Sequence, residues 1–192
     1  MGKIGVLALQ GDFEAHARAL ARAGAETMYV RTRADLEAVD GLVIPGGEST
    51  TMLKLLHAED LFGPLVDFGR TKPIFGTCAG AILLATEVVN PAQECLGLMD
   101  IAVERNAYGT QIDSRVTRLE PAPEFQRRTR AGEMEAVFIR APIIRRVGDG
   151  AAVLASYNGD PVLVEQGRHM VATFHPELTG DTRVHELFLS KL

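Results

Sequence analysis

A single cysteine between two glycines carries the clearest chemical signal in the chain. Cys78 stands in Gly76-Thr-Cys-Ala-Gly80, which follows a short apolar run and precedes an apolar, helix-favouring stretch. Glycines on both sides of a nucleophile at a strand-to-helix junction allow a very tight turn, a nucleophile elbow. The N–H groups that begin the helix would stabilise a thiolate and a developing oxyanion. The pattern indicates a catalytic thiolate, whereas the alternative is a small buried hydrophobic residue.

A histidine and a glutamate near the C-terminus are the candidate partners of this thiol. Residues 171–174 have the composition of a strand, and His175-Pro-Glu177 follows at its carboxyl end, where active sites assemble in α/β sheets. An extended His-x-Glu spacing lets the carboxylate bind one imidazole nitrogen and leaves the other to act as a base. The alternative is a structural histidine–carboxylate pair. A zinc site is disfavoured because these residues lack paired ligands at short spacing.

The other four histidines are assigned no catalytic role. His16 and His185 fall on amphipathic helical segments, where we expect a surface position. His57 ends a helical stretch, where a capping role is sufficient, and His169 stands at the mouth of a hairpin.

A second glycine-rich loop, Pro45-Gly-Gly-Glu-Ser49, follows the apolar run 41–44. Consecutive glycines allow backbone N–H groups to face a ligand. The loop could bind a phosphate, or it could contribute the second donor of an oxyanion hole. The missing P-loop lysine and the acidic Glu48, which could bind a cation, favour the oxyanion hole.

The composition excludes several classes of function. The chain has 192 residues, 46% hydrophobic and 23% charged, which predicts one domain over residues 1–192. A formal net charge of −5 gives no electrostatic signature of a nucleic-acid partner, and no apolar stretch is long enough to span a membrane. Two cysteines make no disulfide framework, and the N-terminus lacks a signal-peptide pattern, so we expect a cytoplasmic protein.

Strand and helix signals alternate in the first half and change to hairpin signals in the second. In the first half we expect strands at residues 4–9, 26–30, 41–44 and 73–75, and helices at 14–23, 34–39, from about 51, and 81–85. In the second half we expect strands at 99–103, 111–119, 135–139, 152–156, 161–166 and 169–174, a surface loop with one helical turn at 120–132, and a last helix at 181–192. This order predicts a three-layer α/β fold whose mostly parallel sheet has helices on both faces and an antiparallel extension.

Taken together, the motifs resemble the class I, triad-type glutamine amidotransferases, and more narrowly the family of glutaminase subunits of pyridoxal 5′-phosphate synthase. The resemblance covers nearly the whole chain. The narrower match rests on five blocks: Gly5-Val-Leu-Ala-Leu-Gln-Gly11, Pro45-Gly-Gly-Glu-Ser-Thr-Thr-Met52, Val103-Glu-Arg-Asn-Ala-Tyr-Gly109, Phe138-Ile-Arg-Ala-Pro142 and His175-Pro-Glu-Leu-Thr179. Tyr108 and Thr110 depart from the family, which usually shows Phe and Arg there.

The resemblance implies a flavodoxin-like fold, L-glutamine as substrate, no cofactor, no metal, and a separate synthase subunit that receives the ammonia. It implies Cys78 as nucleophile, His175 as base and Glu177 as its orienting partner. It also implies an oxyanion hole made by the N–H groups of Gly47 and Ala79, and weak activity until docking of the synthase completes that hole. The implied substrate-binding residues are Gly46, Gly47, Glu48, Ser49, Arg105, Asn106, Ile139 and Arg140.

Three alternatives stay open at this point. The chain could be a triad glutaminase that serves another biosynthetic synthase, and then a different partner would bind it. It could be a thiol hydrolase of similar fold that acts without a synthase. It could also be a non-catalytic binding module, whose function would survive Cys78→Ala.

Overall fold

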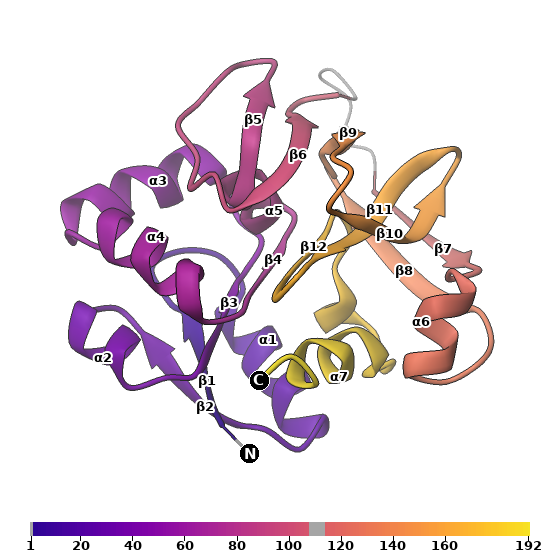
Figure 1. The fold of residues 1–192 in the computed structure, drawn as a ribbon, viewed down its shortest axis with the longest axis horizontal. Coiled ribbons are helices and arrows are strands. Elements are labelled where there is room, and N and C mark those ends of the chain that lie inside the picture. The colour runs from indigo at the N-terminus through magenta and orange to yellow at the C-terminus, as the bar shows by residue number, and fades with distance from the viewer. Residues whose placement is uncertain (1, 108–113) are drawn as a thin grey trace.

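The computed structural model describes residues 2–107 and 114–192. A seven-stranded sheet runs through the centre in the order β10-β11-β12-β4-β3-β1-β2 (Figure 1). The strands are β1 Lys3–Leu7, β2 Glu26–Val30, β3 Gly41–Ile44, β4 Ile74–Thr77, β10 Ala152–Tyr157, β11 Asp160–Gln166 and β12 His169–Ala172. The pairs from β2 to β12 are parallel, whereas β11 pairs antiparallel with both β12 and β10. The expected parallel sheet with an antiparallel extension is confirmed.

Helices cover both faces of this sheet and complete the expected three layers (Figure 1). They are α1 Phe13–Arg22, α2 Arg33–Glu37, α3 Ser49–Ala58, α4 Phe62–Thr71, α5 Ala79–Leu84, α6 Pro123–Arg128 and α7 Arg183–Leu189. No helix in the described part of the chain is both long and apolar enough to cross a membrane.

Side chains point alternately to the two faces of the central sheet, so the apolar core consists of two clusters, one on each face. In β3, Leu42 and Ile44 pack with α2, α3 and α4, whereas Val43 packs on the opposite face with α1 and α7. Residues i and i+1 of a strand point to opposite faces, and both faces are covered, so the strand is apolar throughout. The near-continuous apolar strands of the sequence have this physical cause.

Five strands lie outside the central sheet. β5 Ala85–Val89, β6 Met99–Glu104 and β9 Ile143–Val147 form a three-stranded sheet, and β7 Ser114–Leu119 pairs with β8 Met134–Ile139. The expected strands at 99–103 and 135–139 and the described part of the one at 111–119 are therefore present, but they do not extend the central sheet, and residues 111–113 lie outside the described residues.

β5, β9 and α4 were not expected from the sequence. The apolar alternation of β9 is weak because Arg145 and Arg146 occupy its middle, and these side chains bind Glu104 and Asp100 across the pair with β6 at 2.7 and 2.8 Å. Cross-strand charge pairs of this kind stabilise a sheet without an apolar pattern.

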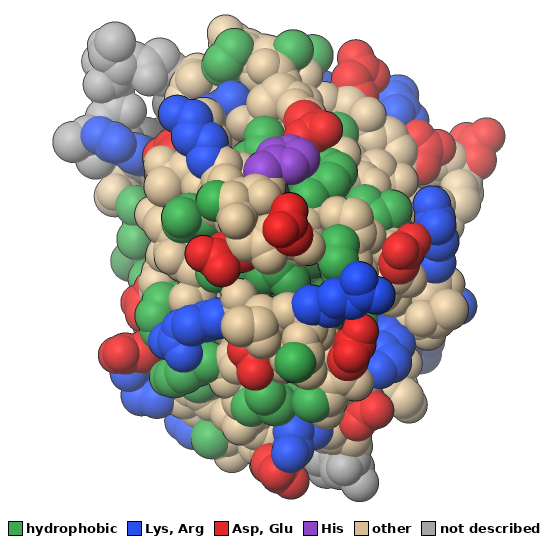
Figure 2. Space-filling model, turned by 90° about the vertical axis from the view of Figure 1, so that its left-hand side faces the viewer, with side chains coloured by type: hydrophobic (Ala, Val, Ile, Leu, Met, Phe, Trp, Pro, Cys, Tyr) green, Lys and Arg blue, Asp and Glu red, His purple; other side chains and the backbone are tan. Residues whose placement is uncertain are grey.

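Charged side chains of both signs are distributed over the face that carries α2, α3 and α4. Figure 2 shows acidic and basic groups interspersed with hydrophobic ones there, without a large area of one sign. Such a mixed surface is typical of a solvent-exposed helical layer.

Candidate active site

The chain makes a strained turn at Cys78, between β4 and α5. Cys78 has φ 51° and ψ −105°, a region that non-glycine residues rarely adopt. Its N–H donates to Ala172 O of β12 at 2.8 Å, which ties the turn to the neighbouring strand. Gly80 follows because a Cβ there would lie 2.3 Å from Ile44 O. The turn holds the thiol, 8% exposed, at the carboxyl end of the sheet.

His175 and Glu177 follow β12, the strand next to β4. His175 Nδ1 donates to Glu177 Oε1 at 2.6 Å, and the Glu177 side chain is 1% exposed. The backbone N–H of His175 donates to Val137 O at 2.8 Å, which fixes the start of the 3-10 helix Pro176–Leu178. The structure therefore brings His175 and Glu177 to Cys78, which lies about a hundred positions earlier in the chain.

The charge state of His175 is set by its two partners. Burial lowers the pKa of this imidazole, but hydrogen bonds to Cys78 and Glu177 and the negative charges of both groups outweigh burial and raise the pKa to about 10. These contacts favour the protonated imidazolium, which is the form that a cysteine nucleophile needs beside it to react as a thiolate.

A cavity of about 300 Å³ opens over the thiol. It is lined by Gly11, Asp12, Gly46, Gly47, Cys78, Ile139, Arg140, His175, Glu177 and Leu178. Seven of these were expected site residues, whereas Gly11, Asp12 and Leu178 had been assigned no role. Cys78 Sγ lies 4.0 Å from Ile139 O at the floor of this cavity.

The glycine loop after β3 is pressed against the loop after β1. Gln10 Oε1 accepts the Glu48 N–H at 2.9 Å and lies only 2.2 Å from where a Cβ of Gly47 would be. Gly47 has φ 157°, and a Cβ on Gly46 would lie 2.7 Å from His175 Cε1. The loop can approach the triad this closely only because neither position has a side chain. Gln10 was assigned no role from the sequence, although it lies in the block of residues 5–11 that resembles the family.

Four further expected site residues do not line the cavity: Glu48 and Ser49 follow the glycine loop, Arg105 contacts Glu48 and Thr50, and Asn106 is next to Arg105 in the chain. Glu48 caps α3, accepting from the Thr51 N–H and hydroxyl, both at 2.6 Å, and the Thr51 hydroxyl is the main cause of the lowered pKa of Glu48. Arg105 Nη2 donates to Thr50 Oγ1 at 2.9 Å and lies 3.9 Å from Glu48 Oε1. Ser49 is buried and donates to Gln93 Oε1 at 3.2 Å.

The last of these four, Asn106, is exposed, with φ 51° and its side-chain amide 3.4 Å from Asn90 O. The two departures from the family, Tyr108 and Thr110, lie outside the described residues.

The expected surface position of His16 and His185 is wrong. Both side chains are 0% exposed and contact each other, and His16 also contacts Glu177. His57 lies in the last turn of α3 and pairs with Glu94. His169 is buried, accepts from the Ile74 N–H at 3.1 Å and donates to Gly69 O at 2.8 Å. A histidine on an amphipathic helix can face either side, so the sequence contained no signal for this burial.

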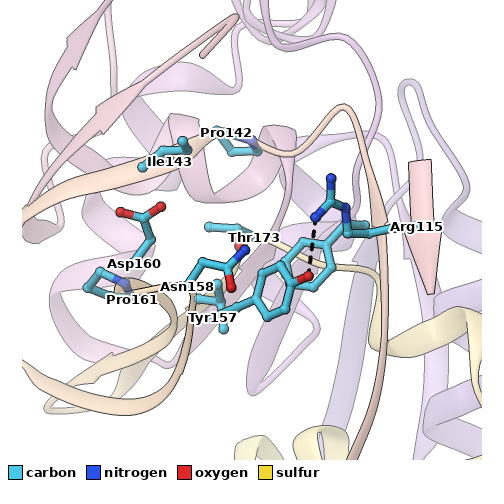
Figure 3. A pocket seen from close by; sticks show the side chains of 10 residues that line it. Arg115, Pro142, Ile143, Tyr157, Asn158, Asp160, Pro161 and Thr173 are labelled. Carbon is cyan, nitrogen blue, oxygen red and sulfur yellow. Dashed lines mark hydrogen bonds between the residues drawn. The ribbon is translucent and has the colours of Figure 1, made fainter. Parts of the chain in front are cut away.

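A second cavity, of about 320 Å³, lies on the other side of β8. Figure 3 shows Arg115 and Tyr157 at its edge, where Arg115 Nη1 donates to the Tyr157 hydroxyl at 3.1 Å, and Asp160 and Asn158 nearby. Phe138 lines this cavity, whereas the next residue, Ile139, lines the cavity over the thiol. The described residues that line it include neither cysteine nor histidine, so the thiol–imidazole pair belongs to the other cavity.

The fold and the site define a class of α/β enzyme that transfers an acyl group through a thiol. The model of the SNO glutamine amidotransferase family matches residues 6–192. The chain is 68% identical over 192 residues, all of both chains, to pyridoxal 5′-phosphate synthase subunit PdxT of Solibacter usitatus. It is 58% identical to the PdxT of Koribacter versatilis, over 97% of this chain and 94% of that protein.

Solved structures agree with these relatives. A crystal structure of a glutamine amidotransferase, 45% identical, superposes with a TM-score of 0.88 and covers 98% of this chain and 97% of its own. The structure of PurLQS from Thermotoga maritima shares the fold, with a TM-score of 0.77 at 17% identity over 99% of each chain. The protein belongs to the SNO glutamine amidotransferase family.

Proposed function

We propose that Cys78, His175 and Glu177 are the catalytic triad with which this protein hydrolyses L-glutamine. The observation that carries the proposal is the buried 2.6 Å bond between His175 and Glu177, in a cavity that also holds the strained cysteine. The bond fixes the imidazole tautomer, so that Nε2 is free to exchange a proton with the thiol.

The protein is a glutaminase subunit of pyridoxal 5′-phosphate synthase. It releases ammonia from glutamine and works with a separate synthase subunit, which uses the ammonia to build the coenzyme. The family match over residues 6–192 and two relatives named as this subunit, at 68% and 58% identity, support this function. The third expected alternative, a non-catalytic module, is disfavoured by the arrangement of the triad.

In the first half of the reaction the Cys78 thiolate attacks the side-chain amide carbon of glutamine. The carbonyl oxygen becomes an oxyanion, for which the backbone N–H groups of Gly47 and Ala79 are the proposed donors. The Ala79 N–H belongs to the first turn of α5, where N–H groups have no partner within the helix. Removing one such donor typically costs about 3–4 kcal/mol of transition-state stabilisation. As the C–N bond breaks, the His175 imidazolium gives its proton to the departing ammonia.

In the second half a water molecule attacks the γ-glutamyl thioester. His175, now neutral, takes a proton from this water, and the tetrahedral intermediate releases the Cys78 thiolate and glutamate. The balance is glutamine and water to glutamate and ammonia. Glu177 keeps its negative charge throughout, because its role is to orient and stabilise the imidazolium.

The amino-acid end of glutamine needs a cation for its carboxylate and an acceptor for its ammonium group. Arg140 and Ile139 line the cavity, together with Gly46 and Gly47. Arg105, Glu48, Ser49 and Asn106 do not line it, and we propose that a bound glutamine extends toward them. Their family positions and their place beside the glycine loop support this assignment.

Ammonia release from glutamine, measured with and without the synthase subunit, tests the function. We expect release by the complex, little release by the isolated chain, and none after Cys78→Ala. Cys95→Ala is the matched control, because Cys95 is the other free cysteine and lies outside the cavity. Ammonia release that survives Cys78→Ala would contradict the triad, and a complex with a different synthase would identify another biosynthetic role.

Two expectations stay predictions. One is the organisation of residues 1–192 as a single domain. The other is the cytoplasmic compartment, which the two free cysteines support.

A further inference from the structure

Two histidines that the proposed chemistry does not use are buried directly behind the triad. His16 lies on α1 and His185 on α7, and their facing nitrogens, His16 Nδ1 and His185 Nε2, are 3.0 Å apart. His16 Nε2 lies 3.0 Å from Thr77 Oγ1 and 3.3 Å from Glu177 Oε2. Because Glu177 Oε1 binds His175, a continuous row of buried polar groups joins the catalytic base to α7.

Both buried imidazoles are neutral at neutral pH. Burial lowers the pKa of His16 well below its ordinary value, and the electrostatic interactions with the rings of His185 and His175 act in the same direction. Burial also lowers the pKa of His185 to about 3, assisted by the charge of Arg22. A neutral imidazole has a single N–H, so the tautomer of each ring decides which contacts are favourable.

One placement of the two protons suits the carboxylate and the other does not. If the His16 proton were on Nδ1, the Nε2 lone pair would face Glu177 Oε2 at 3.3 Å. His185 would then keep a buried Nδ1–H, and that atom has no hydrogen-bond partner among the described residues. An orphaned buried N–H is rare because it costs the full desolvation of the donor.

The opposite placement puts the His16 proton on Nε2. The N–H then faces the anionic Glu177 Oε2 and the Thr77 hydroxyl, while Nδ1 accepts the N–H of His185 Nε2. Glu177 Oε2 is buried and accepts no hydrogen bond from the described part of the chain. The His16 N–H dipole, 3.3 Å away, therefore supplements His175, which binds Oε1, in offsetting the charge of this carboxylate.

We propose that His16 is a positioning residue of the triad: held in its Nε2–H tautomer by His185, it keeps the carboxylate of Glu177 turned toward His175. The inference rests on the proposed function, in which Glu177 stabilises the imidazolium. His16 does not line the cavity over the thiol, so it acts on the reaction through Glu177 and not on glutamine.

Kinetics of the complex with two variants of His16 separate this role from packing. His16→Leu removes the N–H donor, and His16→Gln keeps an N–H donor near the position of Nε2. We expect His16→Leu to lower kcat for glutamine about 10- to 100-fold, with KM within about twofold, since a buried carboxylate loses its partner. His16→Gln should recover most of this loss. His169→Leu is the control, because it removes another buried histidine whose two ring nitrogens hydrogen-bond to backbone atoms.

The titration of His175, followed by NMR of histidine-labelled protein and assigned with His175→Gln, tests the inference without turnover. A less stable Glu177 anion stabilises the imidazolium less, so the titration midpoint should fall in His16→Leu and return in His16→Gln. His185→Phe, which removes the group that sets the tautomer, should lower the same midpoint if His16→Leu fails to fold. Because no substrate is involved, this result stands even if the wild-type complex releases no ammonia, which would refute only the proposed function.

Two outcomes overturn the inference. One is an unchanged His175 midpoint in a folded His16→Leu or His185→Phe protein. The other is an equal loss of kcat in His16→Leu and His16→Gln, because it would mean that the ring fills space and does not act through its N–H.

Discussion

Replacing Glu177 by glutamine removes one negative charge from the site while keeping its shape. The amide oxygen can still accept the His175 Nδ1–H that now makes a 2.6 Å bond to the carboxylate. The substitution therefore isolates the charge of Glu177 from its geometry.

The size of the effect follows from the pKa of His175, which its partners raise from 6.5 to about 10 against the lowering by burial. If Cys78 and Glu177 contribute equally, the loss of one lowers this pKa by about 2, equivalent to about 2.7 kcal/mol of imidazolium stabilisation. The transition state for thiolate attack carries that imidazolium, so kcat should fall about 100-fold. KM should change little, because the amide keeps the volume of the carboxylate.

Two measurements check this prediction. The His175 titration, followed by NMR, should shift to lower pH, and ammonia release by the complex should fall. Glu165→Gln is the control, since Glu165 binds Arg128 and Lys191 on the sheet extension and does not line the cavity. A His175 midpoint that stays near 10, or a kcat within about threefold of wild type, would refute the assignment of Glu177 as the charge partner.

Three further predictions concern the same region. Gly46→Ala places a Cβ 2.7 Å from His175 Cε1 and should lower kcat at least about tenfold, whereas Gly63→Ala, with open space around it, should not. His185 has a lowered pKa, so the stability it contributes is complete above its unfolded value of 6.5 and is lost as pH falls toward about 3. In that pH range the free energy of unfolding, measured with urea, should fall less steeply in His185→Phe than in wild type, by up to about 1.4 kcal/mol per pH unit. His175 has a raised pKa, so the stability it contributes is complete below pH 6.5 and is lost as pH rises through about 10. Cys78→Ala should weaken this loss of stability at alkaline pH. An unchanged dependence of stability on alkaline pH would contradict the pairing of His175 with Cys78.

The residues that do the proposed chemistry could be predicted from the sequence because each has a local signal. The glycines around Cys78 are required by close backbone contacts, since a Cβ on Gly76 would lie 2.5 Å from Gly80 O and a Cβ on Gly80 2.3 Å from Ile44 O, and such requirements are visible directly in the sequence. The position of His175 at the end of an apolar strand is also local. Because the carboxyl ends of parallel strands meet at one edge of a sheet, two strand-end motifs predict one site.

Which strands pair with one another in each sheet was less predictable from the sequence. Strand-like segments in the second half were recognised, but their partners were not, since alternation gives the face of a strand and not its neighbour. β9 was missed because two arginines interrupt its apolar pattern, and its stabilising carboxylates come from β6, about forty residues earlier.

The burial of His16 and His185 was decided only by the tertiary structure. An amphipathic helix shows which residues could face inward, but a polar side chain stays buried only where other elements satisfy its hydrogen bonds. Those partners come from α7, β4 and the turn after β12, and His16 and His185 lie 169 residues apart in the chain. The sequence by itself was enough to predict the proposed nucleophile, its base and the carboxylate. The packing of α1 and α7 against the sheet decided what stands behind that carboxylate, because long-range contacts and not local pattern determine where a neutral histidine can be buried.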